Sequence, residues 1–249
     1  LKTGSIYCNK GITTTLGKGL DQWITIPSIA WYVHDKENNN QILVDTGMCS
    51  TEQANQHHYP GSKQEDGQRI DLALKKIGVN IKDINIIILT HLHWDHCQNL
   101  HLFKNAKFYV QRKELEFARN PIPIYYNSYD TNNPKLTPAF QDVNFELLDG
   151  EKEIIPNIEV FPTPGHSPGH QSVLVKTRKG NYVIAGDAVM SYENLKEDLV
   201  KNIPFVMIGR YMDVKQCWES FRKIKEKADL VLPGHEPKIF EYSEYPPQN

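Results

Sequence analysis

The stretch ILTHLHWDHCQN, residues 88–99, gathers three histidines and one aspartate behind an apolar run, INIIIL, that predicts a buried strand. Side chains alternate along an extended segment, so we expect His91 and His93 to point to one side and converge on one ion. Asp95 and His96 follow, where a bend would turn them toward a second position. Imidazole nitrogens and carboxylate oxygens bind zinc and other first-row divalent ions. The cluster therefore predicts a metal site rather than a packed core, where protonated histidines would repel one another.

Three further candidate ligands each follow an apolar run of strand length. His166 lies in PTPGHSPGH, Asp187 in IAGDAV and His235 in LPGHEP. Each stands beside Gly or Pro, where the chain turns tightly and can hold a side chain at the edge of a sheet. Strand exits converge in layered α/β folds. The sequence thus offers seven candidate ligands, a number that suits two ions.

Apolar runs of strand length alternate with amphipathic segments along the 249 residues. Strands are predicted at 28–33, 41–45, 84–89, 106–111, 158–163, 171–176, 181–186 and 230–234. Helices are predicted at 67–78, 111–120 and 214–228. This order indicates a layered α/β architecture, and we expect one domain over residues 1–249.

Two long segments, 121–140 and 193–212, carry no regular pattern. Both contain many aromatic or aliphatic side chains, which disfavours disorder. Long loops of this kind either serve function or add packing over a sheet. We therefore expect them either to form the walls of a substrate cleft, with Phe205 and Met207 receiving an acyl chain, or to cover the sheet edges.

Composition excludes several classes of partner. The 28 basic and 30 acidic residues nearly balance, which argues against a nucleic-acid-binding surface. No apolar window reaches the roughly 20 residues of a membrane span. The four cysteines show no CxxC pair, so we expect neither a disulfide framework nor a thiolate zinc site, and we expect a reducing cytoplasm as the location.

The HxHxDH run at 91–96, followed by a later histidine, a Gly-Asp and a final Gly-His, resembles the metallo-β-lactamase-fold hydrolase superfamily, and LVDTG at 43–47 adds to the likeness. The resemblance covers roughly residues 28–240 and implies an α/β fold, a four-layer αββα sandwich with a binuclear centre at one edge. It assigns the residues by position: His91, His93 and His166 to one ion, Asp95, His96 and His235 to the other, Asp187 as the bridge, and Asp45 as the carboxylate that orients a ligand histidine. His170 is off the ligand pattern, and we expect a supporting role.

Within the superfamily the chain is most similar to the N-acyl homoserine lactonases. The segments that carry this likeness are ILVDTGM at 42–48, THLHWDH at 90–96, TPGHSPGHQSVLV at 163–175 and SYENLKED at 191–198. Two positions depart from the lactonase pattern. The family places a tyrosine three residues beyond the bridging aspartate, where this chain has Met190 and the nearest tyrosine is Tyr192. It also continues after HxHxDH with a Gly-rich turn, where this chain has CQNL.

The resemblance implies a metal-dependent hydrolase that opens a lactone ring by attack of a metal-bridging hydroxide, and a quorum-quenching role. Asp95 and Asp187 are the expected catalytic carboxylates, and Tyr192 is the candidate donor to the developing oxyanion. The cofactors are expected to be two divalent ions, zinc first, with Fe, Mn or Co as alternatives. We expect a small-molecule substrate with an ester or lactone carbonyl, no nucleic acid or membrane partner, and a homodimer, because related lactonases are often dimers.

Other functions remain open for the same residues. A glyoxalase II-like thioester hydrolase shares the motif, and other ester or phosphodiester hydrolases share the fold. A non-catalytic metal-binding module would keep the ligands without an open coordination position. Metal analysis together with a substrate screen distinguishes these alternatives, because fold does not fix substrate.

Overall fold

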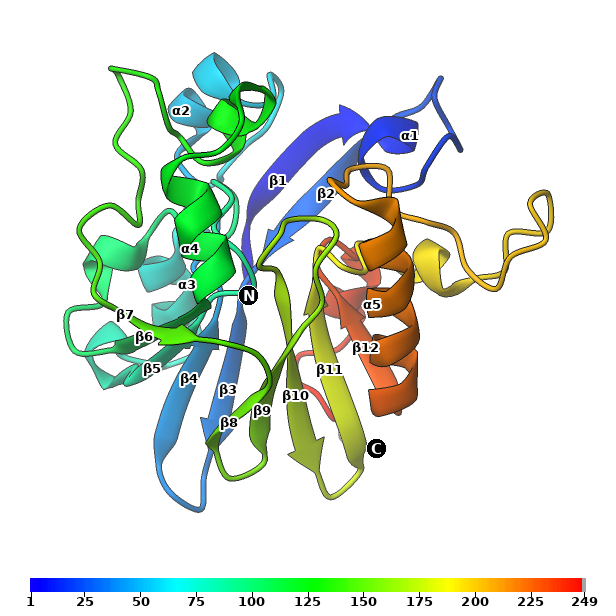
Figure 1. Cartoon of the computed structure of the whole chain (residues 1–249). Helices are drawn as coiled ribbons and strands as arrows, with labels where there is room; N and C mark the ends of the chain where they lie inside the picture. The colour runs from blue at the N-terminus through cyan, green and yellow to red at the C-terminus, as the bar shows by residue number, and fades with distance from the viewer. Residues whose placement is uncertain (248–249) are drawn as a thin grey trace. The chain divides into compact units, whose positions relative to one another are not determined.

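The computed structural model describes residues 1–247, and its contacts divide the chain into two compact units (Figure 1). The first unit comprises Leu1–Tyr7 and Pro27–Asp149. The second comprises Cys8–Ile26 and the described residues from Gly150 onward. Strands β1 (Lys2–Asn9) and β2 (Trp23–Ile29) pair with each other, and each runs from one unit into the other. The single domain expected from the sequence stays a prediction.

The first unit is built on a five-stranded sheet in the order β3-β4-β5-β6-β7. Its strands are β3 (Trp31–Asp35), β4 (Asn40–Val44), β5 (Ile86–Ile88), β6 (Lys107–Gln111) and β7 (Phe145–Leu148). The first pair is an antiparallel hairpin, and the other neighbours run parallel. Parallel strands are buried on both faces and therefore read as continuous apolar runs. All three residues of β5 are buried, as the sequence predicts for this stretch.

The helices of the first unit are short and occupy the connections between its strands (Figure 1). They are α2 (Thr51–His57), α3 (Ile70–Lys76) and α4 (Arg112–Arg119), with 3₁₀ turns η1 (Ile81–Asp83), η2 (Leu100–Leu102) and η3 (Pro123–Ser128). The predicted helices at 67–78 and 111–120 are confirmed as α3 and α4. The predicted strand at 28–33 is interrupted, since β2 ends at Ile29 and β3 begins at Trp31.

The second unit has its own five-stranded sheet in the order β12-β11-β10-β9-β8. Its strands are β8 (Lys152–Ile155), β9 (Ile158–Pro162), β10 (Gln171–Thr177), β11 (Gly180–Gly186) and β12 (Leu230–Pro233). Its helices are α1 (Lys10–Thr13) and α5 (Val214–Lys227), with 3₁₀ turns η4 (Tyr192–Leu195) and η5 (Pro237–Glu241). Each unit thus supplies one sheet and its helices.

Helix α5 covers its sheet with an apolar face (Figure 1). Cys217, Phe221 and Ile224 of this helix are buried in one cluster with Phe161 and Val183 of the strands. At 14 residues, α5 is the longest helix described, and a membrane span needs about 20. No helix within residues 1–247 is long and apolar enough to cross a membrane.

Segment 193–212 adds to this core, so the expected cleft-wall role of Phe205 and Met207 is wrong. Phe205 is 1% exposed, and its ring stacks on Phe221 of α5 with centroids 4.8 Å apart. Met207 belongs to the same buried cluster. Burial of these large apolar side chains against α5 stabilises the fold, and this free energy would be lost if they were exposed in a substrate cleft. The alternative of extra packing over the sheet is the one that the structure supports.

Candidate metal centre

The HxHxDH run begins three residues after β5 and is buried throughout. The rings of His91 and His93 lie with their centroids 4.5 Å apart, and those of His91 and His96 lie 4.2 Å apart. The three imidazoles therefore gather at one end of the first unit's sheet, where the sequence predicts convergence. Regular strand geometry ends at Ile88, and the chain turns at residues 94–96. This bend brings His96 back toward His91.

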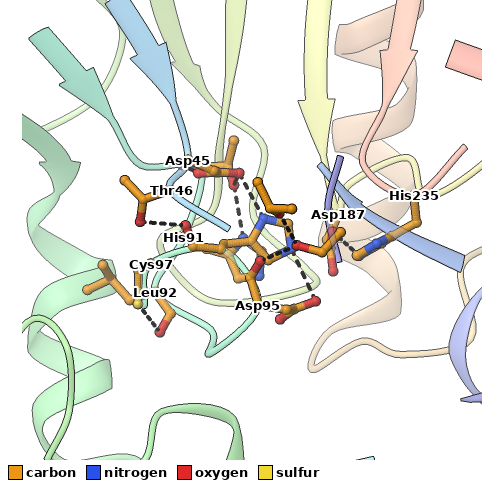
Figure 2. A network of polar contacts seen from close by, with 12 residues as sticks. Asp45, Thr46, His91, Leu92, Asp95, Cys97, Asp187 and His235 are labelled. Atoms are coloured by element: carbon orange, nitrogen blue, oxygen red, sulfur yellow. Dashed lines mark hydrogen bonds and ion pairs between the residues drawn. The ribbon is translucent and has the colours of Figure 1, made fainter. Parts of the chain in front are cut away.

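Asp45 anchors this gathering from the end of the neighbouring strand β4. Its backbone has the left-handed φ of 61°, a conformation that aspartate tolerates better than most residues. One carboxylate oxygen, Oδ1, accepts the backbone N–H of Thr90 at 2.7 Å. The other, Oδ2, accepts the Thr90 hydroxyl and the Nδ1–H of His96, both at 2.8 Å (Figure 2). The expected orienting role of Asp45 thus has a direct contact.

These contacts fix which nitrogen of two imidazoles carries the proton. An ionised carboxylate only accepts hydrogen bonds, so Nδ1 of His96 is protonated, and in the neutral imidazole Nε2 keeps a lone pair. The Thr90 hydroxyl gives its proton to Asp45 and must accept one from Nδ1 of His91, which lies 3.0 Å away. Nε2 of His91 then also keeps its lone pair. One carboxylate prepares two imidazoles to act as metal ligands.

Asp95 lies beside His96 in an arrangement that calls for a cation. Its backbone carbonyl accepts the Ser28 hydroxyl at 2.9 Å, which holds the turn in place. Its Oδ2 lies 3.5 Å from Nε2 of His96. Since Nε2 carries no proton in the tautomer set by Asp45, two electron-pair donors face each other in a buried position. A divalent ion near both would remove the repulsion, so this donor pair fits a metal.

The second unit holds a matching set around Asp187, which follows β11. Oδ2 of Asp187 lies 3.2 Å from Nε2 of His166. Oδ1 of Asp187 lies 3.0 Å from Nε2 of His235, and Figure 2 shows this pair. Nδ1 of His166 lies 2.9 Å from the carbonyl oxygen of Arg210, so it carries the proton and Nε2 again has the lone pair. All three residues are buried. A carboxylate with one imidazole nitrogen at each oxygen fits two cations, one on either side.

His170 contacts the backbone of Asp187. Its Nε2 accepts the backbone N–H of Asp187 at 3.0 Å, so Nδ1 carries the proton and donates to the Thr163 hydroxyl at 2.9 Å. Thr163 contacts the Ser172 hydroxyl at 2.8 Å, and Ser172 donates to the carbonyl of Ala185 at 3.1 Å. All these side chains are buried. In this chain of hydrogen bonds each group donates to the next, from the Asp187 N–H to the Ala185 carbonyl. The chain holds the backbone that carries Asp187.

Tyr192 begins η4, and its backbone N–H donates to Oε2 of Glu236 at 2.7 Å. Burial raises the pKa of the Tyr192 phenol to about 12, with Tyr245 and Glu236 adding to the effect. The phenol therefore keeps its proton at neutral pH and is able to donate it in a hydrogen bond. Its role toward an oxyanion stays a prediction. Met190, at the family's tyrosine position, is 1% exposed and lies in the apolar cluster beneath α5.

The CQN residues after the motif have a local explanation. The Asn99 amide donates to the carbonyls of Thr46 and Met48, at 2.8 and 3.2 Å, and so ties the motif to the chain after β4. The Gln98 amide donates to the carboxylate of Asp130. These side-chain hydrogen bonds hold the residues after the motif, where the lactonase pattern has a Gly-rich turn.

Sequence reasoning missed two buried acids near the motif, Glu114 and Asp130. Glu114 sits in an otherwise charged helix, where a glutamate normally faces solvent. Asp130 lies in the long segment after α4, and the DTNNP stretch there reads as an ordinary turn. The glutamate has a weak signal in the sequence, because it precedes Leu115 and lies four residues before Ala118 on the buried face of α4.

Comparison with known proteins places the chain in a family. The model of the metallo-β-lactamase superfamily matches residues 26–235, which cover all seven candidate ligands. The chain therefore belongs to the metallo-β-lactamase superfamily. This match and the structural likeness below confirm the expected family and fold, and they support a hydrolase of this superfamily.

Relatives within the superfamily narrow the comparison. The N-acyl homoserine lactonase of Bacillus cereus is 31% identical over 208 residues, which cover 78% of this chain and 76% of the relative. An N-acyl homoserine lactone hydrolase solved with N-hexanoyl-L-homoserine at its catalytic metal centre superposes with a TM-score of 0.76 at 24% identity, covering 97% of this chain and 93% of that one. A dizinc quorum-quenching lactonase gives 0.68 at 21% identity, with 95% and 86% covered.

Proposed function

We propose that this protein is a metal-dependent lactonase that opens the ring of an N-acyl homoserine lactone or a related lactone. The observation that carries the proposal is the buried Asp187 carboxylate with an imidazole nitrogen within 3.2 Å of each oxygen. The similarity to the Bacillus cereus lactonase supports the choice of substrate class.

The proposed ligand sets follow the family pattern. His91, His93 and His166 would hold one divalent ion, Asp95, His96 and His235 the other, and Asp187 would bridge them. Each set includes histidines whose tautomer is fixed by a hydrogen bond. The partner in that bond belongs to the same unit as the histidine: Thr90 for His91, Asp45 for His96 and Arg210 for His166. Zinc is the proposed metal, because imidazole and carboxylate donors suit it and a lactonase of similar fold is a dizinc enzyme.

Bound divalent ions supply Lewis-acid activation of the lactone carbonyl and of a water molecule. The chain's own residues provide the rest of the chemistry. Asp45 holds protons on the far nitrogens of His91 and His96, which keeps both rings oriented during turnover. Asp95 and Asp187 are buried carboxylates able to accept a proton as the ring opens. The raised pKa of Tyr192 keeps its phenol protonated, so that it can donate to the ring oxygen as that oxygen gains charge.

An acyl chain needs apolar side chains that are open to solvent. Segment 121–140 provides Ile122, directly before η3, and Ile124 within it, and these side chains are 55% and 77% exposed. We propose that these two side chains, rather than the buried Phe205 and Met207, contact the acyl chain. Loss of such contacts would raise KM for long-chain lactones more than for short ones.

The proposal extends to the assembly and location of the protein. A homodimer is the proposed assembly, because related lactonases are often dimers, and light scattering of the purified protein would test it. A reducing cytoplasm is the proposed location, since all four cysteines are free and buried. Fractionation of cells that express the tagged protein would test the location.

A substrate panel with metal analysis tests the proposed activity. The purified protein should hydrolyse N-acyl homoserine lactones. Each ring opened releases one equivalent of acid, and pH-stat titration measures this release. It should show lower rates on a γ-lactone without an acyl chain, on a glutathione thioester and on a phosphodiester. Preference for the thioester or the phosphodiester would replace the lactonase assignment with the corresponding hydrolase. Metal binding without turnover of any substrate would indicate a non-catalytic module.

Two ligand variants test the metal dependence of that activity. His93→Ala and Asp187→Asn each remove a donor atom, so turnover should fall to background and the metal content measured by elemental analysis should fall with it. His101→Ala changes an exposed histidine outside the ligand pattern and serves as the control. Full activity in a metal-stripped sample would contradict the proposal.

A further inference from the structure

A buried glutamate, Glu114, lies outside the expected ligand set. It contacts the chain segment that carries the expected ligands His91 and His93. Glu114 is the third residue of α4 and is fully buried, at 0% exposure. Taking a carboxylate out of water costs several kcal/mol unless hydrogen bonds replace its hydration. A fold that buries a carboxylate must therefore satisfy it locally, and the groups that do so are informative about its role.

One of these groups belongs to the HLH stretch itself. The backbone N–H of Leu92 donates to Oε1 of Glu114 at 3.0 Å. Leu92 stands between His91 and His93 in a part of the chain that lies beyond the regular strand β5. No sheet hydrogen bond takes up that N–H, and Glu114 supplies the acceptor. The carboxylate thus fixes the backbone that spaces the two imidazoles.

The second group holds the His93 ring. The hydroxyl of Tyr129 donates to the same Oε1 of Glu114 at 3.1 Å. The Tyr129 ring packs edge-on against His93, with centroids 4.7 Å apart and planes inclined by 65°. Tyr129 is 1% exposed, so its contact with Glu114 is shielded from bulk solvent. Glu114 therefore bears on His93 twice, through the preceding backbone and through the aromatic ring that packs on its side chain.

We infer that Glu114 is a positioning residue for His93, acting through Leu92 and Tyr129. The inference rests on the proposed function in one respect, that His93 is a metal ligand. It goes beyond that function because it assigns the stability of metal binding to a side chain in α4. Partners that orient ligand groups typically change metal affinity by about 10–100-fold when they are removed.

Three variants of the full-length protein separate this role from a general effect on folding. Glu114→Gln keeps an oxygen that accepts both hydrogen bonds. Glu114→Leu removes the acceptor at similar volume, and Tyr129→Phe removes only one donor while keeping the ring on His93. Glu116→Leu alters an exposed residue of the same helix and serves as the matched control.

The measurement is zinc affinity by competition with a chromogenic chelator, with circular dichroism to verify folding. We expect Glu114→Leu to weaken zinc binding about 10–100-fold, Tyr129→Phe to weaken it less, and Glu114→Gln and the control to match the wild type. The cobalt-loaded protein should show shifted visible absorption bands for Tyr129→Phe, because the aromatic ring that packs on His93 is no longer fixed by the hydroxyl contact with Glu114. A purely structural role would leave these bands unchanged.

Each outcome bears on the inference. Wild-type zinc affinity in a folded Glu114→Leu protein would overturn it. If Glu114→Leu does not fold, wild-type affinity together with unchanged cobalt bands in Tyr129→Phe would overturn it instead. Absence of zinc binding by the wild type would overturn the proposed function and this inference together, whereas equal binding by all variants would overturn the inference alone.

Discussion

At the scale of single residues, Asp45 shows how one side chain can prepare several others. Its carboxylate accepts from Thr90 and from His96, and through the Thr90 hydroxyl it also fixes the proton of His91. The left-handed backbone at this position turns the carboxylate back toward the next strand. A hairpin-turn aspartate without these contacts would have no such effect on the imidazoles.

Replacing Asp45 with Asn should disturb the tautomers while sparing the backbone. Asparagine tolerates the left-handed conformation, but its amide nitrogen cannot accept a hydrogen bond. In the zinc-loaded wild type, proton NMR should show slowly exchanging, downfield Nδ1–H signals for His91 and His96. We expect at least one of them to disappear in Asp45→Asn and to persist in Asp142→Asn, an exposed control. Two unchanged signals in Asp45→Asn would contradict the assignment.

The sequence pattern indicated the candidate ligands directly, and the structure buries these side chains near one another within each unit. A cluster of histidines at a strand end has few structural uses and is informative in itself, whereas a single aspartate there is also a common turn residue. Glu114 and Asp130 differ, because an isolated acid in a charged helix or a polar turn normally faces water. Their importance arises from tertiary partners that no local sequence pattern specifies. Glu114 contacts Leu92 and Tyr129, and Asp130 contacts Gln98.

At the scale of elements, Asp130 ties segment 121–140 to two other parts of the first unit. Its carboxylate accepts from the Gln53 amide of α2 at 3.2 Å and from Gln98 after the motif, and it lies 3.1 Å from Nε2 of His58. His58 stacks on Trp94, with ring centroids 4.2 Å apart and planes 2° from parallel. An irregular segment thus becomes part of the fold through one buried charge.

Removing that charge should destabilise the first unit. Asp130→Ala would leave two half-buried amides and the buried ring of His58 without their acceptor, and donors left unsatisfied in this way cost about 1–3 kcal/mol. We expect a loss of this size in the free energy of unfolding, measured by urea denaturation. Asp142→Ala, in an exposed part of the same unit, should change it by less than about 0.5 kcal/mol. Equal effects of the two substitutions would show that the network contributes little.

Sequence reasoning missed β1, most of β2, β7 and β8, and the last two share a physical cause. β7 and β8 each have four residues, and each lies at the edge of its sheet. Edge strands are exposed along one side and carry polar residues, so their apolar pattern is short and weak. The inner strands β5, β10 and β11 contain runs of three, four and five buried residues, and they were predicted within two residues at each end. Burial on both faces is what makes a strand visible in a sequence.

At the scale of the whole molecule, carboxylates with lowered pKa values are spread through both units. In the second unit, Lys227 donates to Glu151 at 2.8 Å and Lys223 lies 3.2 Å away. The hydrogen bond from Lys227 is the largest cause that lowers the pKa of Glu151, from the usual 4.5 to about 2. Asp71 in the first unit also has a lowered pKa, through its hydrogen bonds with Arg69.

Such carboxylates make stability depend on acid in a defined direction. Because the folded state holds Glu151 ionised to a lower pH than the unfolded chain does, its contribution is complete above pH 4.5 and is lost as the pH falls toward 2. We expect the free energy of unfolding to decrease over this range. Glu151→Gln should reduce the slope, and Glu244→Gln, at an exposed position, should not. Denaturant titrations at several pH values provide the measurement, and an unchanged slope in Glu151→Gln would contradict the expectation.

The burial of Met190 limits which amino acids can replace it during evolution. A tyrosine placed there by a single mutation would have to fit more volume, and a hydroxyl, into a cluster filled by Val189, Phe205 and Ile208. Overpacking of a core and burial of an unsatisfied hydroxyl each cost about 1–3 kcal/mol. A tyrosine at residue 190 would therefore be tolerated better after neighbouring core residues had become smaller. Laboratory evolution started from this sequence should recruit a phenol elsewhere sooner than at residue 190.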